Sequence, residues 1–152
     1  MNSLMDIGSA DTAPWNIAEH KSEGSVILLR YRPDLKPYIG LDSHPQRLVI
    51  LWDYEPSNSS GMPTDELNES MRDFEDRIVN SLDHDRVAIF AFALTKYGVR
   101  EWHFYAGDIS EIGGRINSAL SDLPVLPIQL QVEDDPHWSE LRAVYELCNE
   151  LP

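Results

Sequence analysis

The chain has 152 residues, a length that fits one domain with a core of its own. Hydrophobic residues make up 42% of the chain, which excludes an intrinsically disordered protein. Its 26 acidic and 12 basic residues give a formal net charge of −14, so the chain as a whole repels a phosphate backbone, and we expect no direct nucleic-acid partner.

The cysteine content and the hydropathy pattern indicate a cytoplasmic protein. The single cysteine, Cys148, cannot form an internal disulfide or a thiolate zinc site, and it is expected in the core. No stretch approaches the roughly 20 apolar residues that span a bilayer, and the N-terminus lacks a signal-peptide pattern, so we expect no membrane partner. We expect residues 1–13 to form a loosely ordered N-terminal arm and residues 14–152 to form one domain.

Two strands are expected in the first third of the chain. Residues 25–31 read SVILLRY and end before Pro33, which donates no backbone hydrogen bond. A long loop with three prolines follows. Residues 47–54 form the next strand, which is apolar on both faces except for Asp53.

A helix is expected to begin after Thr64. Asp65 and Glu66 lie in its first turn, where carboxylates stabilise the positive end of the helix dipole. The apolar residues of this helix recur at helical spacing: Leu67, Met71, Phe74, Ile78 and Leu82. The opposite face is acidic, with Glu69, Asp73 and Asp76.

A β-hairpin is expected over residues 87–105, joined by the turn Lys96-Tyr97-Gly98. The first strand is apolar on both faces, and simple alternation places Phe90 and Phe92 together on one of them. The second strand, 99–105, carries the densest mixture of charged and aromatic side chains in the chain. We therefore expect any functional site to include it.

The last third of the chain predicts a helix, a strand and a helix. Asp108 and Glu111 resemble a capping box at the start of the first helix. Residues 128–133 alternate between apolar and polar side chains, which predicts a strand with one solvent-exposed face. Asp135 and Pro136 are expected to begin the final helix.

This order of elements predicts an α+β fold. Residues 48–132 follow the order βαββαβ, a ferredoxin-like split βαβ core in which helices cover one face of an antiparallel sheet. We expect an additional N-terminal strand and a C-terminal helix around this core. Strand 87–95 then lies at an edge, where its apolar surface favours aggregation. We infer that strand 25–31 or a second subunit, in a homodimer, pairs beside it.

Four segments together resemble a known family. They are Trp15 with the strand of Arg30, GMP at 61–63 followed by Glu66 and FED, TKYGVREWHFY at 95–105, and EDDPHW at 133–138. In order and spacing the chain resembles the bacterial family called domain of unknown function 695, from Trp15 onward. The resemblance implies a bacterial origin and an α+β domain, and it implies no catalytic residues.

Glu101, His103 and Tyr105 alternate along one strand and therefore share a face. A carboxylate beside an imidazole suits proton transfer or a divalent cation, and it also occurs on the polar face of an ordinary half-exposed strand. No further ligands accompany the pair at the spacing of a metal site, so we predict no metal and no cofactor.

Arg30, Arg32 and Arg100 are conspicuous in so acidic a chain. They can gather around an anion, or they can pair with acids of the chain itself: Glu75, Asp53 or Glu101. The candidate ligand-binding residues are Arg30, Arg100, Glu101, His103 and Tyr105. Such a site requires Arg30, Glu101 and His103 to lie within hydrogen-bonding reach of one concavity.

The sequence favours a non-enzymatic protein that acts as an acidic protein-binding or regulatory domain. The chain lacks a nucleophile elbow, a phosphate-binding glycine loop and an HExxH zinc motif, and we assign no catalytic residue. Its acidity would steer it toward a basic protein surface. One alternative is a small-ligand-binding protein or an unfamiliar enzyme with its site on strand 99–105. Another is an immunity protein or a nucleic-acid-mimicking decoy.

Overall fold

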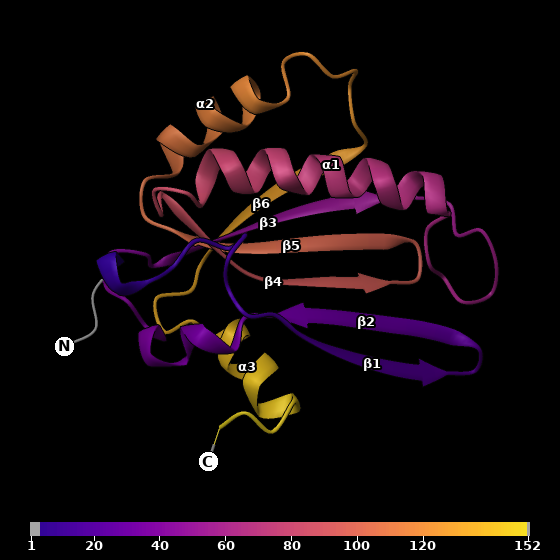
Figure 1. Cartoon of the computed structure of the whole chain (residues 1–152), viewed down its shortest axis with the longest axis horizontal. Helices are drawn as coiled ribbons and strands as arrows, with labels where there is room; N and C mark the ends of the chain where they lie inside the picture. Colours follow the sequence, from indigo (N-terminus) through magenta and orange to yellow (C-terminus); the bar gives the residue numbers. More distant parts are fainter. Residues whose placement is uncertain (1–3, 152) are drawn as a thin grey trace.

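A six-stranded antiparallel sheet forms the centre of the molecule (Figure 1). The computed structural model describes residues 4–151. In spatial order the strands are β1 (Asn16–Ser22), β2 (Ser25–Tyr31), β4 (Ala88–Lys96), β5 (Val99–Ala106), β3 (Gln46–Asp53) and β6 (Ile128–Asp134). The predicted α+β class and antiparallel sheet are confirmed. The order of the whole sheet differs from that of a four-stranded ferredoxin-like sheet, because two N-terminal strands extend it.

Helices lie on both faces of the sheet. Helices α1 (Asp65–Leu82) and α2 (Ile109–Ala119) cover one face, and α3 (Ser139–Leu147) lies against the other (Figure 1). Two 3₁₀ helices, η1 (Leu4–Asp6) and η2 (Pro33–Tyr38), complete the chain's helical elements in its described part. The prediction that helices cover only one face is wrong, because β4 is apolar on both faces and β5 is buried on both faces from Trp102 to Ala106.

The first core lies between the sheet and the α1–α2 layer. It combines the predicted apolar stripe of α1 with alternate residues of the central strands. Its buried members include Leu48, Ile50, Phe90, Trp102, Phe104, Met71, Phe74 and Ile78. The Thr64 side chain accepts a hydrogen bond from the Leu67 backbone N–H, as expected for the start of α1.

The second core lies between the sheet and α3. Its buried members include Leu29, Ile89, Ala91, Tyr105, Trp138, Leu141 and Tyr145. Helix α3 begins at Ser139, not at Asp135 as predicted, because Trp138 adopts a left-handed conformation with φ 53° and is fully buried. The Asp135 carboxylate still caps the helix by accepting hydrogen bonds from the backbone N–H groups of Ser139 and Glu140. Cys148, just after the helix, is half-buried beside this core.

Strand β1 was not predicted, and its sequence explains why. The segment NIAEHKS has few β-branched or aromatic residues, and most of its side chains are exposed at the edge of the sheet. Glu23 and Gly24 both have positive φ and form the two-residue turn that joins β1 to β2. The sheet therefore has two N-terminal strands where one was expected.

Strand β2 pairs with β4 within the chain, through the register Leu28–Thr95 to Tyr31–Phe92. Strand β2 therefore covers the apolar edge of β4, and this arrangement requires no second subunit. At the other edge of the sheet, β6 is exposed on both faces from Gln129 to Asp134, so the prediction of a single exposed face is wrong. No helix within residues 4–151 is both long and apolar enough to cross a membrane.

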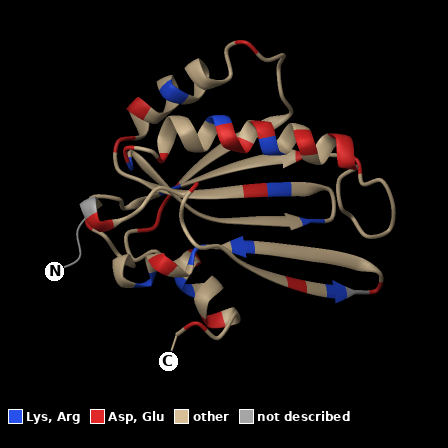
Figure 2. Cartoon of the chain, viewed as in Figure 1, with Lys and Arg blue, Asp and Glu red and all other residues tan. Residues whose placement is uncertain are grey.

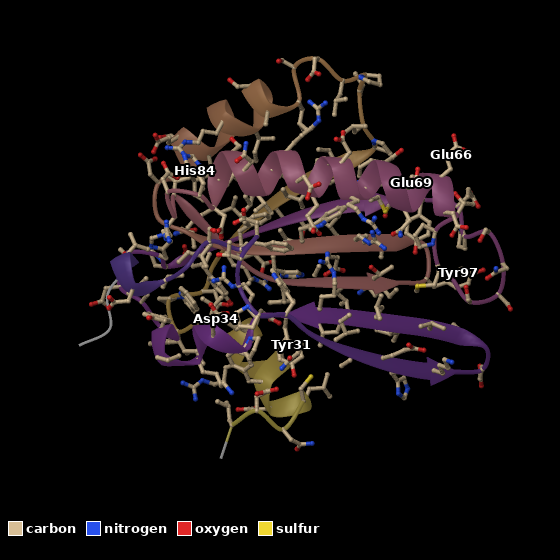
Figure 3. The ribbon with its side chains drawn as sticks, viewed as in Figure 1. Tyr31, Asp34, Glu66, Glu69, His84 and Tyr97 are labelled. Atoms are coloured by element: carbon tan, nitrogen blue, oxygen red, sulfur yellow. The ribbon has the colours of Figure 1, made fainter. Side chains whose placement is uncertain are left out.

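Both ends of the described chain are tied to the body of the protein. Ile7 and Ala10, in the segment expected to be a loose arm, are buried. Near the C-terminus, Glu150 accepts hydrogen bonds from the Tyr31 hydroxyl at 2.7 Å and from Lys36 Nζ at 2.8 Å. Figure 3 shows Tyr31 beside α3, where this contact joins the C-terminal segment to β2.

Candidate functional site

The register of the sheet separates the five candidate residues into two groups. Arg30 lies opposite Ala93, which lies opposite Trp102 of the first core, so Arg30 faces α1. Arg100 is two residues from Trp102 on β5 and shares that face. Glu101, His103 and Tyr105 occupy the alternate positions and face the α3 side. Arg30, Glu101 and His103 therefore do not meet in one concavity.

A small cavity of about 220 Å³ opens between α1 and the strands that carry Arg30 and Arg100. Helix α1 contributes Asn68, Arg72 and Glu75 to its lining. The sheet contributes Leu28, Arg30, Ala93, Thr95 and Arg100. This cavity, hereafter the arginine cavity, brings three guanidinium groups together in a chain whose net charge is −14.

Arg30 is held by Glu75, one of the acids expected from the sequence. Its two terminal nitrogens donate to the two oxygens of the Glu75 carboxylate in a forked arrangement. The same carboxylate accepts a hydrogen bond from Trp102 Nε1 at 2.9 Å. The Arg30 guanidinium also lies over the ring of Trp15, 5.6 Å from its centroid. These contacts fix the position of Arg30 at one wall of the cavity.

Arg100 has no such acidic partner. Its Nε donates to the Thr95 hydroxyl at 2.8 Å, and in the part of the chain that the structure describes it forms no ion pair. Burial lowers the pKa of the Arg100 guanidinium, and the positive charges of Arg30 and Arg72 lower it further, whereas Glu75 raises it. The two terminal nitrogens of Arg100 are thus free to donate to a ligand in the cavity.

The sequence did not identify three further residues that line the cavity: Asn68, Arg72 and Thr95. Asn68, Arg72 and Glu75 follow one another at spacings of four and three, so they share one face of α1. Arg72 is exposed and forms no ion pair with any residue between 4 and 151. The available signal was an arginine within an acidic helix, Arg72, one turn before Glu75, which was already a suspected partner of an arginine.

The Glu101 and His103 pair forms a buried network on the α3 side. The His103 Nε2 lies 2.9 Å from Glu101 Oε1, and its Nδ1 lies 3.5 Å from Arg47 Nη1. Because arginine can only donate, Nδ1 accepts and Nε2 carries the proton that is donated to Glu101. Burial lowers the pKa of His103, so the ring is neutral in this arrangement, and it stacks on Phe92 with ring centroids 4.1 Å apart.

Tyr105 belongs to the second core. Its ring stacks on Trp138 at a centroid distance of 4.3 Å, and its hydroxyl donates to Asp135 Oδ2 at 2.8 Å. Burial raises the pKa of the Tyr105 hydroxyl, so it remains a hydrogen-bond donor. Because its side chain is fully buried, Tyr105 serves to attach α3 to the sheet.

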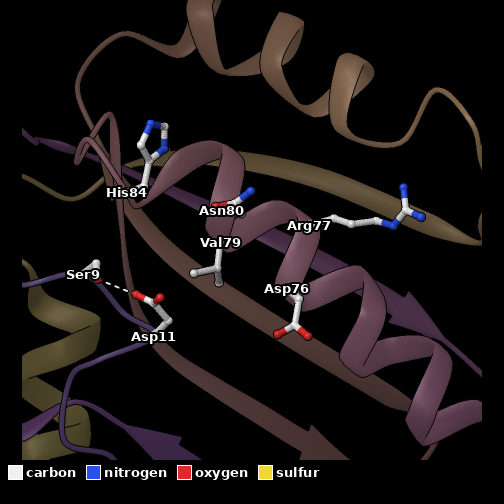
Figure 4. Close-up of a pocket in the computed structure, with 7 residues that line it drawn as sticks. All are labelled: Ser9, Asp11, Asp76, Arg77, Val79, Asn80 and His84. Carbon is white, nitrogen blue, oxygen red and sulfur yellow. Dashed lines mark hydrogen bonds between the residues drawn. The ribbon is translucent and has the colours of Figure 1, made fainter.

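A larger cavity of about 420 Å³ lies between the N-terminal segment and the end of α1. Its lining includes Asp11, Asp76, Arg77 and His84. In Figure 4 the His84 ring and the Arg77 guanidinium point away from Asp11 and Asp76, and Arg77 is bound to Asp122 at 2.7 Å. The charged groups do not converge, and among residues 4–151 no group of His, Cys, Asp and Glu side chains is arranged to hold a metal ion.

The comparison with protein families agrees with the resemblance seen in the sequence. The model of a family of unknown function (DUF695) matches residues 13–142. The chain belongs to this family. The match includes the strands and the helix that form the arginine cavity. No curated protein and no solved structure matches the chain.

Proposed function

We propose that the protein binds a small ligand through an anionic group that is held in the arginine cavity. The observation that carries the proposal is Arg100, a half-buried guanidinium whose neighbours in the cavity are two further arginines. Glu75 is the one acid that lines the cavity, and it is already bound to Arg30. Arginine forks are well suited to carboxylates and phosphates.

The electrostatics of the cavity favour an anion. Like charges held together and partly removed from water raise the free energy of the folded protein. An anion that accepts hydrogen bonds from Arg72 and Arg100 would relieve this repulsion. Both oxygens of Glu75 are engaged by Arg30, and one also by Trp102, so the cavity offers donors and no free general base. Binding therefore accounts for these residues better than catalysis.

A titration with sulfate, followed by NMR of the arginine Nε–H groups, tests the proposal. Ionic strength is held constant with sodium chloride, since screening alone shifts exposed charges. We expect saturable shifts for Arg30, Arg72 and Arg100. Arg142, which is exposed on α3, is the internal reference and should not saturate.

The matched variants are Arg72→Met, in the cavity, and Arg142→Met, outside it. Both remove one positive charge from an exposed helical position, so both are expected to fold. Saturation should be lost in the first and kept in the second. Shifts that never saturate in the wild type, or that survive Arg72→Met unchanged, would refute the proposal.

A second candidate function is binding of a basic protein surface, for which the outer face of α1 gives a specific observation. Figure 2 shows acidic positions along this helix, and Figure 3 places Glu66 and Glu69 at its beginning. Glu66, Glu69 and Asp76 form no ion pairs with other described residues. A cavity of about 410 Å³ is lined by the acids Glu66, Glu69 and Asp73 together with apolar residues that include Trp52, Phe74 and Leu126. A lysine or arginine side chain from a partner suits this combination.

This second candidate predicts salt-sensitive association. Pull-downs with the wild type should recover a discrete partner that is lost at high salt and in Glu66→Lys/Glu69→Lys, while Glu19→Lys on β1 keeps it. Recovery that is equal for all three proteins would contradict a role for α1.

We also propose that β3, α1, β4, β5, α2 and β6 form a ferredoxin-like unit to which β1 and β2 are added. The neighbour order β4-β5-β3-β6 and the antiparallel pairing support this classification.

A further inference from the structure

We infer that the anionic group in the arginine cavity is a dianion, namely the phosphoryl group of a phosphate monoester. This inference rests on the proposed function and names the class of ligand. It follows from three properties of the cavity: the balance of charge, the kinds of hydrogen-bonding group in its lining, and its size.

The charge balance of the lining calls for two negative charges. Three arginines and one glutamate line the cavity, which leaves two positive charges uncompensated. A carboxylate or a sulfate monoester would neutralise one of them. A phosphate monoester carries between about −1.5 and −2 at neutral pH and neutralises both.

Most of the polar groups that remain free are donors. Arg100 offers its two terminal nitrogens, and Arg72 offers its whole guanidinium. Thr95 already accepts from Arg100 Nε, so its own hydroxyl proton is directed to another acceptor. Asn68 adds a side-chain amide that can donate. A phosphoryl group, with three oxygens that only accept, is matched to this set.

The size of the cavity favours a compact dianion. At about 220 Å³ it has room for a phosphoryl group and a few further atoms, and it is smaller than the sites that hold typical drug-sized ligands. In a phosphoryl group both charges lie on one centre, within reach of arginines that come from different elements. A dicarboxylate divides its charges between two centres. Leu28 and Ala93 provide apolar surface for the first atoms of the ester group.

Calorimetric titration with phenyl phosphate and phenyl sulfate tests the inference directly. The two probes have the same shape and differ in charge by about one at neutral pH. At about pH 7.5 and constant ionic strength, we expect phenyl phosphate to bind at least about tenfold more tightly. Near pH 5, where phenyl phosphate carries one charge because its second pKa is about 6, the difference should nearly vanish.

Variants connect this preference to the cavity. Arg100→Met and Arg72→Met should each weaken the binding of phenyl phosphate by at least about tenfold. The affinity of Arg142→Met should stay within about twofold of the wild type. Arg72 is exposed, so its variant keeps the test valid even if Arg100→Met does not fold. Equal affinity of all the variants for phenyl phosphate would overturn the assignment to this cavity.

Malonate and sulfate separate this inference from the proposed function. If phenyl sulfate or malonate binds as tightly as phenyl phosphate, and Arg72→Met abolishes that binding, the protein is an anion binder and the phosphate-ester assignment is wrong. If none of the four probes binds saturably, both the assignment and the proposed function are wrong.

Discussion

Asp83 is a buried carboxylate that joins the N-terminal segment to the sheet. Its two oxygens accept hydrogen bonds from the backbone N–H groups of Ala10, at 2.6 Å, and Phe90, at 2.8 Å. Arg32, whose side chain is fully buried, lies 3.6 Å away and also donates to the carbonyls of Gly8 and Phe90. Burial raises the pKa of Asp83, and these donors and Arg32 act against that shift.

Replacing Asp83 with alanine is expected to destabilise the protein strongly. The change removes one of the two acids beside the buried Arg32, the other being Asp34, and leaves two backbone N–H groups without acceptors. We expect a loss of about 3 kcal/mol or more in the free energy of unfolding, measured by urea denaturation. Asp122→Ala, which removes an exposed partner of Arg77, should cost far less, because solvent screens exposed ion pairs. Equal losses in the two variants would contradict a structural role for Asp83.

His103 makes the stability of the protein depend on pH. Burial lowers its pKa in the folded state below the ordinary value of 6.5. As the pH falls through 6.5, His103 takes up a proton in the unfolded chain but not in the folded chain, so the free energy of unfolding decreases. The contribution of neutral His103 to the free energy of unfolding is therefore present above this pH and is lost below it.

The variant His103→Gln, which cannot titrate, tests this dependence. Between about pH 7 and pH 5.5 its stability should fall less steeply than that of the wild type. His44, whose pKa burial also lowers, contributes the same trend to both proteins, and the raised pKa of Asp83 contributes the opposite trend to both. The difference between the two urea-denaturation series isolates His103. A steeper fall in the variant would show that His103 is protonated in the folded state.

At the scale of elements, the loop between β3 and α1 is fixed against the β4–β5 turn. Gly61 has a φ of 83°, and a Cβ there would lie 2.7 Å from Tyr97 Cδ2 and 2.9 Å from Tyr97 Cα. The Tyr54 hydroxyl donates to the Gly61 carbonyl at 2.6 Å. Only glycine accepts both this backbone conformation and this close approach.

Two glycine-to-alanine changes are therefore expected to have opposite effects. Gly61→Ala should lower the free energy of unfolding by about 2 kcal/mol or more, since both the conformation and the contact are strained. Gly114→Ala should raise it by up to about 1 kcal/mol, because Gly114 lies within α2 and an alanine methyl group there would have no atom within 4 Å outside its own helix backbone and chain neighbours. Thermal unfolding of the two variants gives the measurement, and a common sign would contradict this account.

Elements with strong local patterns were predictable from the sequence. The apolar stripe of α1, its Thr64 cap and the capping residue Asp108 of α2 are all as expected. Strand β1 was missed because its sequence is polar and its pairing with β2 depends on a turn with two positive φ values. The beginning of α3 was misplaced because the left-handed conformation of Trp138 results from burial, which no local pattern reveals.

The candidate site was only half predictable, because a β-bulge changes which residues share a face. Simple alternation places Phe90 and Phe92 together, but the bulge between them sends Phe90 to the first core and Phe92 to the second. Thr95 consequently faces α1 beside Arg100. Arg30 and Arg100 could be singled out as unusual in an acidic chain. That they line the same cavity depends on the register of three strands, which the sequence does not give.

At the scale of the whole molecule, a net charge of −14 sets the response to salt. Repulsion among like charges destabilises the compact state. Arg77 and Arg115 form ion pairs that oppose it, but these pairs are largely exposed and contribute little. Raising the ionic strength from about 0.01 M to 0.15 M shortens the Debye length from about 30 Å to about 8 Å, so the long-range repulsion is screened first.

We therefore expect the unfolding temperature to rise with sodium chloride over this range. Differential scanning calorimetry of the wild type and of Arg72→Met separates general screening from anion binding. Screening raises the unfolding temperature of both proteins alike. Chloride bound in the arginine cavity would raise that of the wild type more, because a ligand that binds the folded state stabilises it. A fall in the unfolding temperature of both would mean that attractive ion pairs outweigh the net repulsion, and it would contradict this account.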